Sequence, residues 1–162
     1  MIIDSRNEFC DAVTVNTGAA GTYLIGSQID VSVTGAATAP GHIGAVDALY
    51  LVISVDTGIT AGSAGTIAFK LASDDTAAIA TNGTASEHFS TAAFVTGTGT
   101  GTTTLKAGTV LAAVAMPKSF SYERFLGVLQ VTGTAAITAG KVNAFLTSDP
   151  ALWASFDSPS QA

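Results

Sequence analysis

The chain has 162 residues, and only 11% of them are charged, against roughly 25% in a typical soluble domain. Its formal net charge of −6 disfavours a nucleic-acid partner, because such a partner is bound by clustered Lys and Arg. A free monomer with so few charges has little to keep it apart from its neighbours. The composition therefore predicts a surface covered by copies of the chain or by a larger assembly, and it points away from a free metabolic enzyme.

The length suits a single domain over residues 1–162, and the larger apolar residues are too numerous for a disordered chain. Cys10 is the only cysteine, so we expect a small buried side chain and no internal disulfide. No stretch approaches the ~20 apolar residues of a membrane span, and the first residues lack the pattern of a secretory signal. We expect no membrane partner, and a protein made in the cytoplasm that stays there until it joins an assembly.

Alternation of apolar and polar residues, which is typical of strands, runs through most of the chain. Residues 49–55 are apolar on both alternating sets, so this strand should be covered on both faces and should stop at the turn residues 56–58. The predicted strands are residues 13–15, 22–25, 28–33, 49–55, 66–71, 88–90, 109–115, 124–131 and 141–147. This pattern predicts an all-β, single-domain β-sandwich, jelly-roll-like, with extended termini.

Three segments depart from strand periodicity. Residues 76–81 are rich in Ala but lack an amphipathic stripe, and the Thr/Gly-rich residues 96–104 indicate a surface loop or a weak edge strand. Near the C-terminus, Asp149 is a suitable N-cap, and the following proline suits the first position of a short helix.

The tail, residues 149–162, is predicted to be a docking element. It contains the only tryptophan, Trp153, with Phe156 three residues later. Large apolar side chains are rare in disordered tails, so both are candidate interface residues. They could pack on their own sandwich, on a sister subunit or on a larger assembly.

Reactive side chains do not form a recognisable pattern. The two histidines, His42 and His88, lie far apart, whereas a zinc site needs three or four convergent ligands. Asp56, Asp74 and Asp75 lack the spacing of a calcium loop and suit turns instead. No nucleophile motif is present. We therefore expect no catalytic residues, no metal and no cofactor.

The pair Glu123 and Arg124 opens an apolar strand. It is either a strand-end ion pair, which contributes little to stability where it is exposed, or part of an interface. We keep both residues as interface candidates.

Three segments carry a family resemblance: residues 1–12, residues 47–57, and residues 122–153. In order and spacing they resemble the capsid cement, or decoration, proteins of short-tailed, podovirus-type bacteriophages. The resemblance implies a jelly roll that assembles as a small homo-oligomer on the outside of an icosahedral head, where it bridges major capsid subunits. It implies no catalytic residues.

We therefore expect a structural protein of the virion whose partners are the major capsid protein and the chain itself, with a dimer favoured slightly over a trimer. The alternative is a carbohydrate-binding jelly-roll module of a phage fibre or a cell-surface protein. Such modules use exposed aromatic platforms, and this chain has one Trp and three Tyr to offer.

Overall fold

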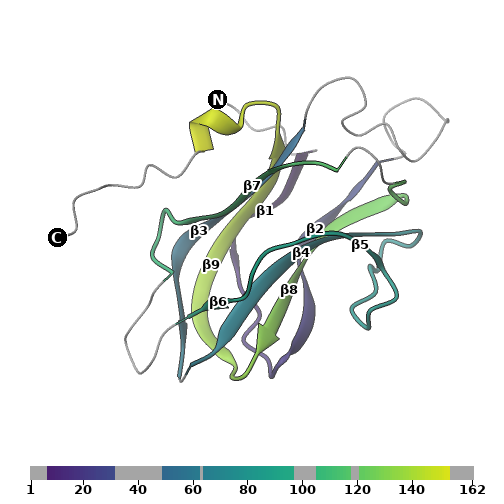
Figure 1. The fold of residues 1–162 in the computed structure, drawn as a ribbon. Helices are drawn as coiled ribbons and strands as arrows, with labels where there is room; N and C mark the ends of the chain where they lie inside the picture. Colours follow the sequence, from purple (N-terminus) through teal and green to yellow (C-terminus); the bar gives the residue numbers. More distant parts are fainter. Residues whose placement is uncertain (1–6, 32–48, 63, 97–104, 118–120, 154–162) are drawn as a thin grey trace.

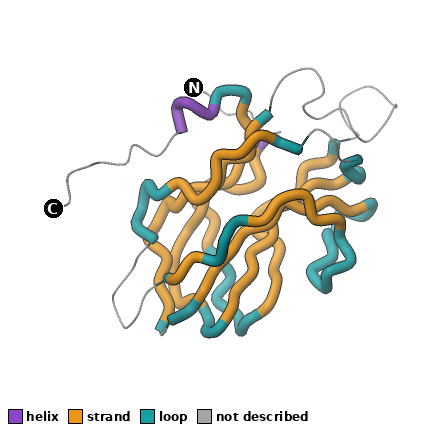
Figure 2. The backbone as a smooth tube through the Cα atoms, in the orientation of Figure 1, coloured by secondary structure: helices purple, strands orange, loops and turns teal. Residues whose placement is uncertain are grey.

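Strands make up most of the computed structural model, which describes residues 7–31, 49–62, 64–96, 105–117 and 121–153 (Figure 2). No α-helix occurs in these residues, and the 3-10 turn η2 (Pro150–Trp153) lies at the end of the described part of the chain. The strands are β1 (Glu8–Thr14), β2 (Gly21–Asp30), β3 (Tyr50–Ala61), β4 (Thr66–Asp74), β5 (Ser86–Ser90), β6 (Phe94–Val95), β7 (Val110–Ala115), β8 (Phe125–Gly133) and β9 (Ile137–Thr147).

The strands pair as a long antiparallel ribbon that has been rolled up. β1 pairs with β9, β2 with β8, β3 with β7, and β4 with β5. Successive pairs alternate between a four-stranded sheet, β1-β9-β3-β7, and a five-stranded sheet, β2-β8-β4-β5 with β6 also on β4 (Figure 1). This order is that of a jelly roll. The all-β sandwich predicted from strand periodicity is therefore confirmed.

The core lies between the inner faces of the two sheets. Leu51, Ile53 and Val55 of β3 alternate inward, and Phe69 and Leu71 of β4 face them from the other sheet. All five are at most 2% exposed. Successive side chains of a strand point to opposite faces, and this explains why the apolar residues recur at every second position of the sequence.

Both outer faces are partly covered by other segments of the chain. On the four-stranded sheet, Val52 is fully buried, as predicted for a strand apolar on both sides. On the five-stranded sheet, the loop after β4 places Ile79 over Ala72 and Leu129, which form a second, smaller apolar cluster. The residues of the predicted 76–81 segment that make this cover form turns and bends, not a helix.

Strand boundaries differ from the sequence prediction in several places. β1 begins at Glu8, before the strand predicted at 13–15, and β9 begins at Ile137, before the one predicted at 141–147. β3 continues to Ala61, because its pairing with β9 runs on through register shifts beyond Val55, so the stop predicted at residues 56–58 is wrong. The two strands predicted at 22–25 and 28–33 are one strand, β2. The short strand β6 was not predicted, and residues 97–104 lie outside the described part of the chain.

A glycine bulge joins the two halves of β2. The register with β8 shifts between Ile25 and Ile29, and Gly26 takes φ +68° there. A Cβ atom at this position would collide with the carbonyl oxygen of Phe9 and would lie 2.6 Å from the Cβ of Cys10. Only glycine fits both the backbone conformation and the close approach of β1.

We expect Gly26→Ala to lower the free energy of unfolding by about 2–4 kcal/mol, because a strained backbone is added to a steric clash. Gly83→Ala is the matched control: Gly83 also has a positive φ, +91°, but nothing lies within 4 Å of its would-be Cβ. Gly83→Ala should lower the free energy of unfolding only by the cost of the backbone strain. Urea denaturation measures both, and equal losses in the two variants would contradict the close packing of β1 on β2.

Candidate functional site

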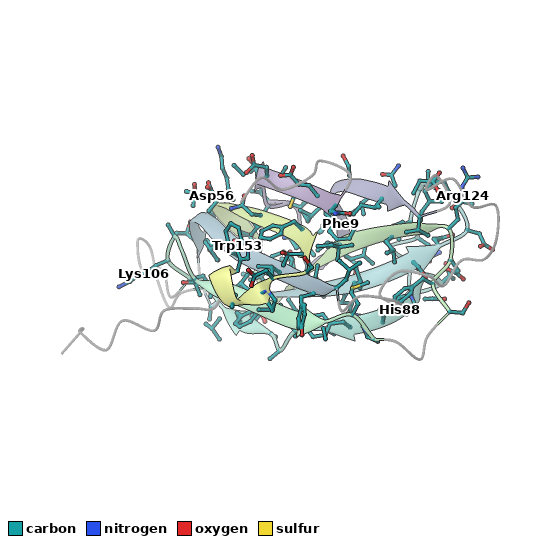
Figure 3. All side chains as sticks on the ribbon, turned by 90° about the horizontal axis from the view of Figure 1, so that it is seen from above. Phe9, Asp56, His88, Lys106, Arg124 and Trp153 are labelled. Atoms are coloured by element: carbon teal, nitrogen blue, oxygen red, sulfur yellow. The ribbon has the colours of Figure 1, made fainter. Side chains whose placement is uncertain are left out.

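A polar cluster surrounds Glu123, two residues before the start of β8. The Oγ of Ser73, on β4, lies 2.7 Å from the Nε2 of His88, on β5, and donates to the Glu123 carboxylate at 3.3 Å. The backbone N–H of Glu123 donates back to Ser73 Oγ at 3.1 Å, and Ser86 Oγ donates to the same carboxylate at 3.2 Å. The cluster therefore ties three strands together at one end of the sandwich, where Figure 3 labels His88 and Arg124.

Serine, histidine and glutamate in contact invite comparison with a hydrolase triad, but the geometry differs. In a triad the carboxylate orients the imidazole, and the serine is open to substrate. Here the Glu123 carboxylate binds the serine hydroxyl itself, and Ser73 is fully buried. The arrangement gives the buried Ser73 hydroxyl its hydrogen-bond partners, as folding requires of a buried polar group.

Aromatic packing fixes the imidazole in place. The rings of His88 and Tyr122 lie 4.4 Å apart between centroids, and the Tyr122 hydroxyl donates to the carbonyl of Pro117 at 2.7 Å. Burial raises the pKa of Tyr122 to about 12. For His88, burial lowers the pKa, and the negative charge of Glu123 opposes that shift without cancelling it.

Arg124 points away from this cluster. Its guanidinium makes a bidentate ion pair with Asp30 at the end of β2, 2.8 Å at the shortest, and lies over the Phe125 ring. The ion-pair partner of Arg124 is therefore Asp30 and not Glu123, which corrects the pairing suggested by their adjacency in sequence. Neighbouring residues of an extended chain point to opposite sides, so the two charges diverge. The Arg124 side chain is 54% exposed and remains a candidate interface residue.

Trp153 packs on the outer face of the four-stranded sheet. Its ring meets that of Phe145, on β9, edge to face, with centroids 4.8 Å apart. The 3-10 turn that carries it begins as predicted: Asp149 Oδ1 accepts the N–H of Ala151 at 3.1 Å, and Pro150 takes the first position. Of the three surfaces considered for this segment, residues 150–153 use their own sandwich. Phe156 lies outside the described residues.

The other reactive side chains have structural partners. Asp74 accepts N–H bonds from Thr76 and Ala80, and these bonds lower the pKa of its carboxyl. Cys10 is buried, which raises the pKa of its thiol to about 12 and leaves it a small core residue, as expected. His42 lies outside the described residues, and within the described ranges no three His, Cys, Asp or Glu side chains gather where they could hold a metal.

A family model supplies the identification. The model named Bbp16 matches residues 9–146, which is most of the chain. The chain belongs to the Bbp16 family. This is a family of phage proteins, so the phage origin implied by the sequence resemblance is confirmed at that level. No curated protein matches the chain.

The family match ends before the turn that carries Trp153, so the Bbp16 segment comprises the jelly roll without that cover. In the described part of this Bbp16-family chain, no helix has the length and apolar character needed to cross a membrane.

The polar cluster has a signal in the sequence that is not among the predicted site residues. In β4 the alternating set Ile67, Phe69 and Leu71 continues to Ser73, a polar residue in a core position. A buried polar side chain must find partners, so such a position marks a hydrogen-bonded cluster. Gln130 in β8 is a second case: fully buried, it accepts from the N–H of Asn16 and donates to the carbonyl of Asn16, and so holds the turn between β1 and β2.

Replacing Trp153 by alanine should lower the free energy of unfolding by about 2 kcal/mol, less than the roughly 3–5 kcal/mol of a fully buried aromatic ring. The reason is the loss of ring packing on Phe145. Trp153→Phe keeps an aromatic ring there and should lose less than half as much. Chemical denaturation of the three proteins is the measurement, and an unchanged Trp153→Ala variant would show that η2 contributes nothing to stability.

Stability should fall as the pH is lowered through the ordinary histidine pKa of roughly 6.5. The folded-state pKa of His88 lies below that value, so the unfolded chain takes up the proton first and is favoured by acid. His88→Gln removes this proton uptake and should flatten the dependence between pH 7 and pH 5.5. Melting temperatures across that range test it, and identical slopes for both proteins would refute it.

Proposed function

We propose that this Bbp16-family chain is a capsid cement protein, which binds the outside of the assembled phage head and bridges major capsid subunits. The observation that carries the proposal is the surface that a phage-family jelly roll presents here. Only 11% of the chain is charged, against roughly 25% in a typical soluble domain, and most of its exposed uncharged strand residues have small side chains. These residues are Thr14, Gly26, Ser27, Thr57, Ser90, Val95, Ala113, Ala115, Thr138 and Ala139.

Depletion of charge is what distinguishes the centre of a protein interface from ordinary surface. Small side chains also let a neighbouring chain approach the strands closely. A phage protein with such a surface is suited to contact its neighbours over several of its sides, as a bridging subunit of a shell does. The jelly roll itself supports this function, because it is a fold of viral capsid proteins.

The mechanism of stabilisation follows from mass action. A protein that binds the assembled shell, and not the dissociated subunits, stabilises the shell by its free energy of binding. Each head offers many equivalent sites, and a cement protein that is itself oligomeric engages several of them at once, so weak contacts add up. No chemical step is needed, and the Ser73–His88–Glu123 cluster then serves the fold.

Jelly rolls also occur in lectins, which favours the carbohydrate-binding alternative at the level of fold. The aromatic residue best suited to a sugar platform is the single tryptophan, and its ring is packed against Phe145. The cement function therefore accounts for more of the observed surface.

Heads of the parent phage assembled without this protein should bind the purified chain saturably and withstand a higher temperature before releasing DNA. The reason is the added binding free energy at every site. Cosedimentation and a thermal-release assay measure the two effects, and complete virions, already saturated, serve as the control. Heads that neither bind the chain nor gain stability would refute the cement function, and binding to a glycan array instead would favour the alternative.

A further inference from the structure

Strand β7 is an open edge of the four-stranded sheet. In the described part of the chain it pairs with β3 alone. The N–H of Met116 donates to the carbonyl of Leu49. The backbone N–H and C=O groups of successive residues point to alternate sides of a strand, so those of Val114 also point toward β3. The N–H and C=O groups of Ala113 and Ala115 therefore point away from the sheet. These are free hydrogen-bonding groups of the kind that another strand can pair with.

No charged residue or proline lies within residues 112–116 of this edge; the nearest proline, Pro117, follows them directly. Natural edge strands are protected by charged side chains, proline, bulges or twisted ends. The strand reads VLAAVA, its two exposed side chains are Ala113 and Ala115, and its one register shift lies at its beginning, opposite Ser54. The pairing of residues 112–115 with β3 is regular, and the side chains exposed along this edge are small and apolar.

The other edges are guarded. β1 has two register shifts, takes a positive φ at Ala12, and carries Glu8 and Asp11. The edge strand of the five-stranded sheet is interrupted between β5 and β6, where the hydroxyl of Thr91 takes the place of a backbone acceptor for Phe69. At its other edge, β2 is broken by the Gly26 bulge and lies against β1.

We propose that residues 112–116, which comprise the end of β7 and the residue after it, pair antiparallel with the same residues of a second copy of this chain, joining two four-stranded sheets into one continuous sheet. This inference deepens the proposed function, on which it rests, by naming how the homo-oligomer forms.

Symmetry favours a second copy as the occupant. A two-fold axis through Val114 places Ala113 opposite Ala115 of the second copy, and the reverse, as two hydrogen-bonded pairs that each exchange both N–H···O bonds. The two Val114 side chains then face each other as a close β-branched pair, which stabilises a sheet. They are half-buried in one copy and already pack against the core. Edge strands with Glu8 or Asp11 would instead bring like charges together.

The test removes the outward N–H while leaving the ladder to β3 intact. Ala113→Pro does so, because the Ala113 N–H points away from β3 and proline is tolerated on an edge. Ala113→Ser keeps the N–H and is the matched control. We expect the wild type and Ala113→Ser to sediment as dimers at micromolar concentration, and Ala113→Pro to raise the dimer dissociation constant at least tenfold with an unchanged circular dichroism spectrum.

A second pair of variants tests the same pairing if Ala113→Pro does not fold. Ala113→Lys places a guarding charge on the edge and should also weaken the dimer, whereas Ala139→Lys adds the same charge at an exposed position of the central strand β9 and should not.

Three outcomes would overturn the β7 pairing: a monomeric wild type, dimers untouched by both Ala113→Pro and Ala113→Lys, or intact dimers that no longer bind heads, which would assign the edge to a capsid strand. The cement function is judged separately, by binding of the wild type to heads, so a failure of one proposal is distinguishable from a failure of the other.

Discussion

The pairing of the first strand with the last is the contact on which the rest of the structure depends. β1 lies beside β9 with Cys10 opposite Ala144, so residues more than a hundred positions apart must meet before the four-stranded sheet is complete. The same pairing places β1 against the Gly26 bulge of β2, where the two sheets come together. Because contacts of such long range delay folding, the rolled ribbon is expected to form slowly for its size.

Two buried polar groups make that arrangement specific. Gln130 holds the Asn16 backbone from inside the five-stranded sheet, and Ser73 binds both His88 and Glu123. Neither group could face the core without these partners, since an unpaired buried polar atom costs free energy. A slip of one residue in β4 or β8 would place these side chains on the outer face, so they help to select one register.

How much of this could be predicted depended on whether the information was local. Alternation of apolar and polar residues predicted β4 and most of β9, because each strand has one face in the core. The turn after Asp149 could be predicted from adjacent residues alone. The extension of β3 past Val55 could not be seen, because its turn-like residues are held extended by β9. The ion pair between Arg124 and Asp30, ninety-four positions apart, results from the register of two paired strands and could not be predicted from sequence spacing. Among the candidate interface residues, the packing of Trp153 could be predicted from its size and from the cap before it. The polar cluster could not be predicted, because only the fold brings its residues together.

Phe145 marks a place where the two ends of the described chain come together. Glu8 stands opposite Phe145 in the strand register, and the Trp153 ring packs on the Phe145 ring. Ends this close could be joined by a short linker and the chain reopened at a surface loop, giving a circular permutant with the same sheets. A peptide fused directly at Glu8 or at Trp153 would then emerge at one corner of the four-stranded sheet, so that on a particle bearing many copies both fusions would display their cargo at the same points.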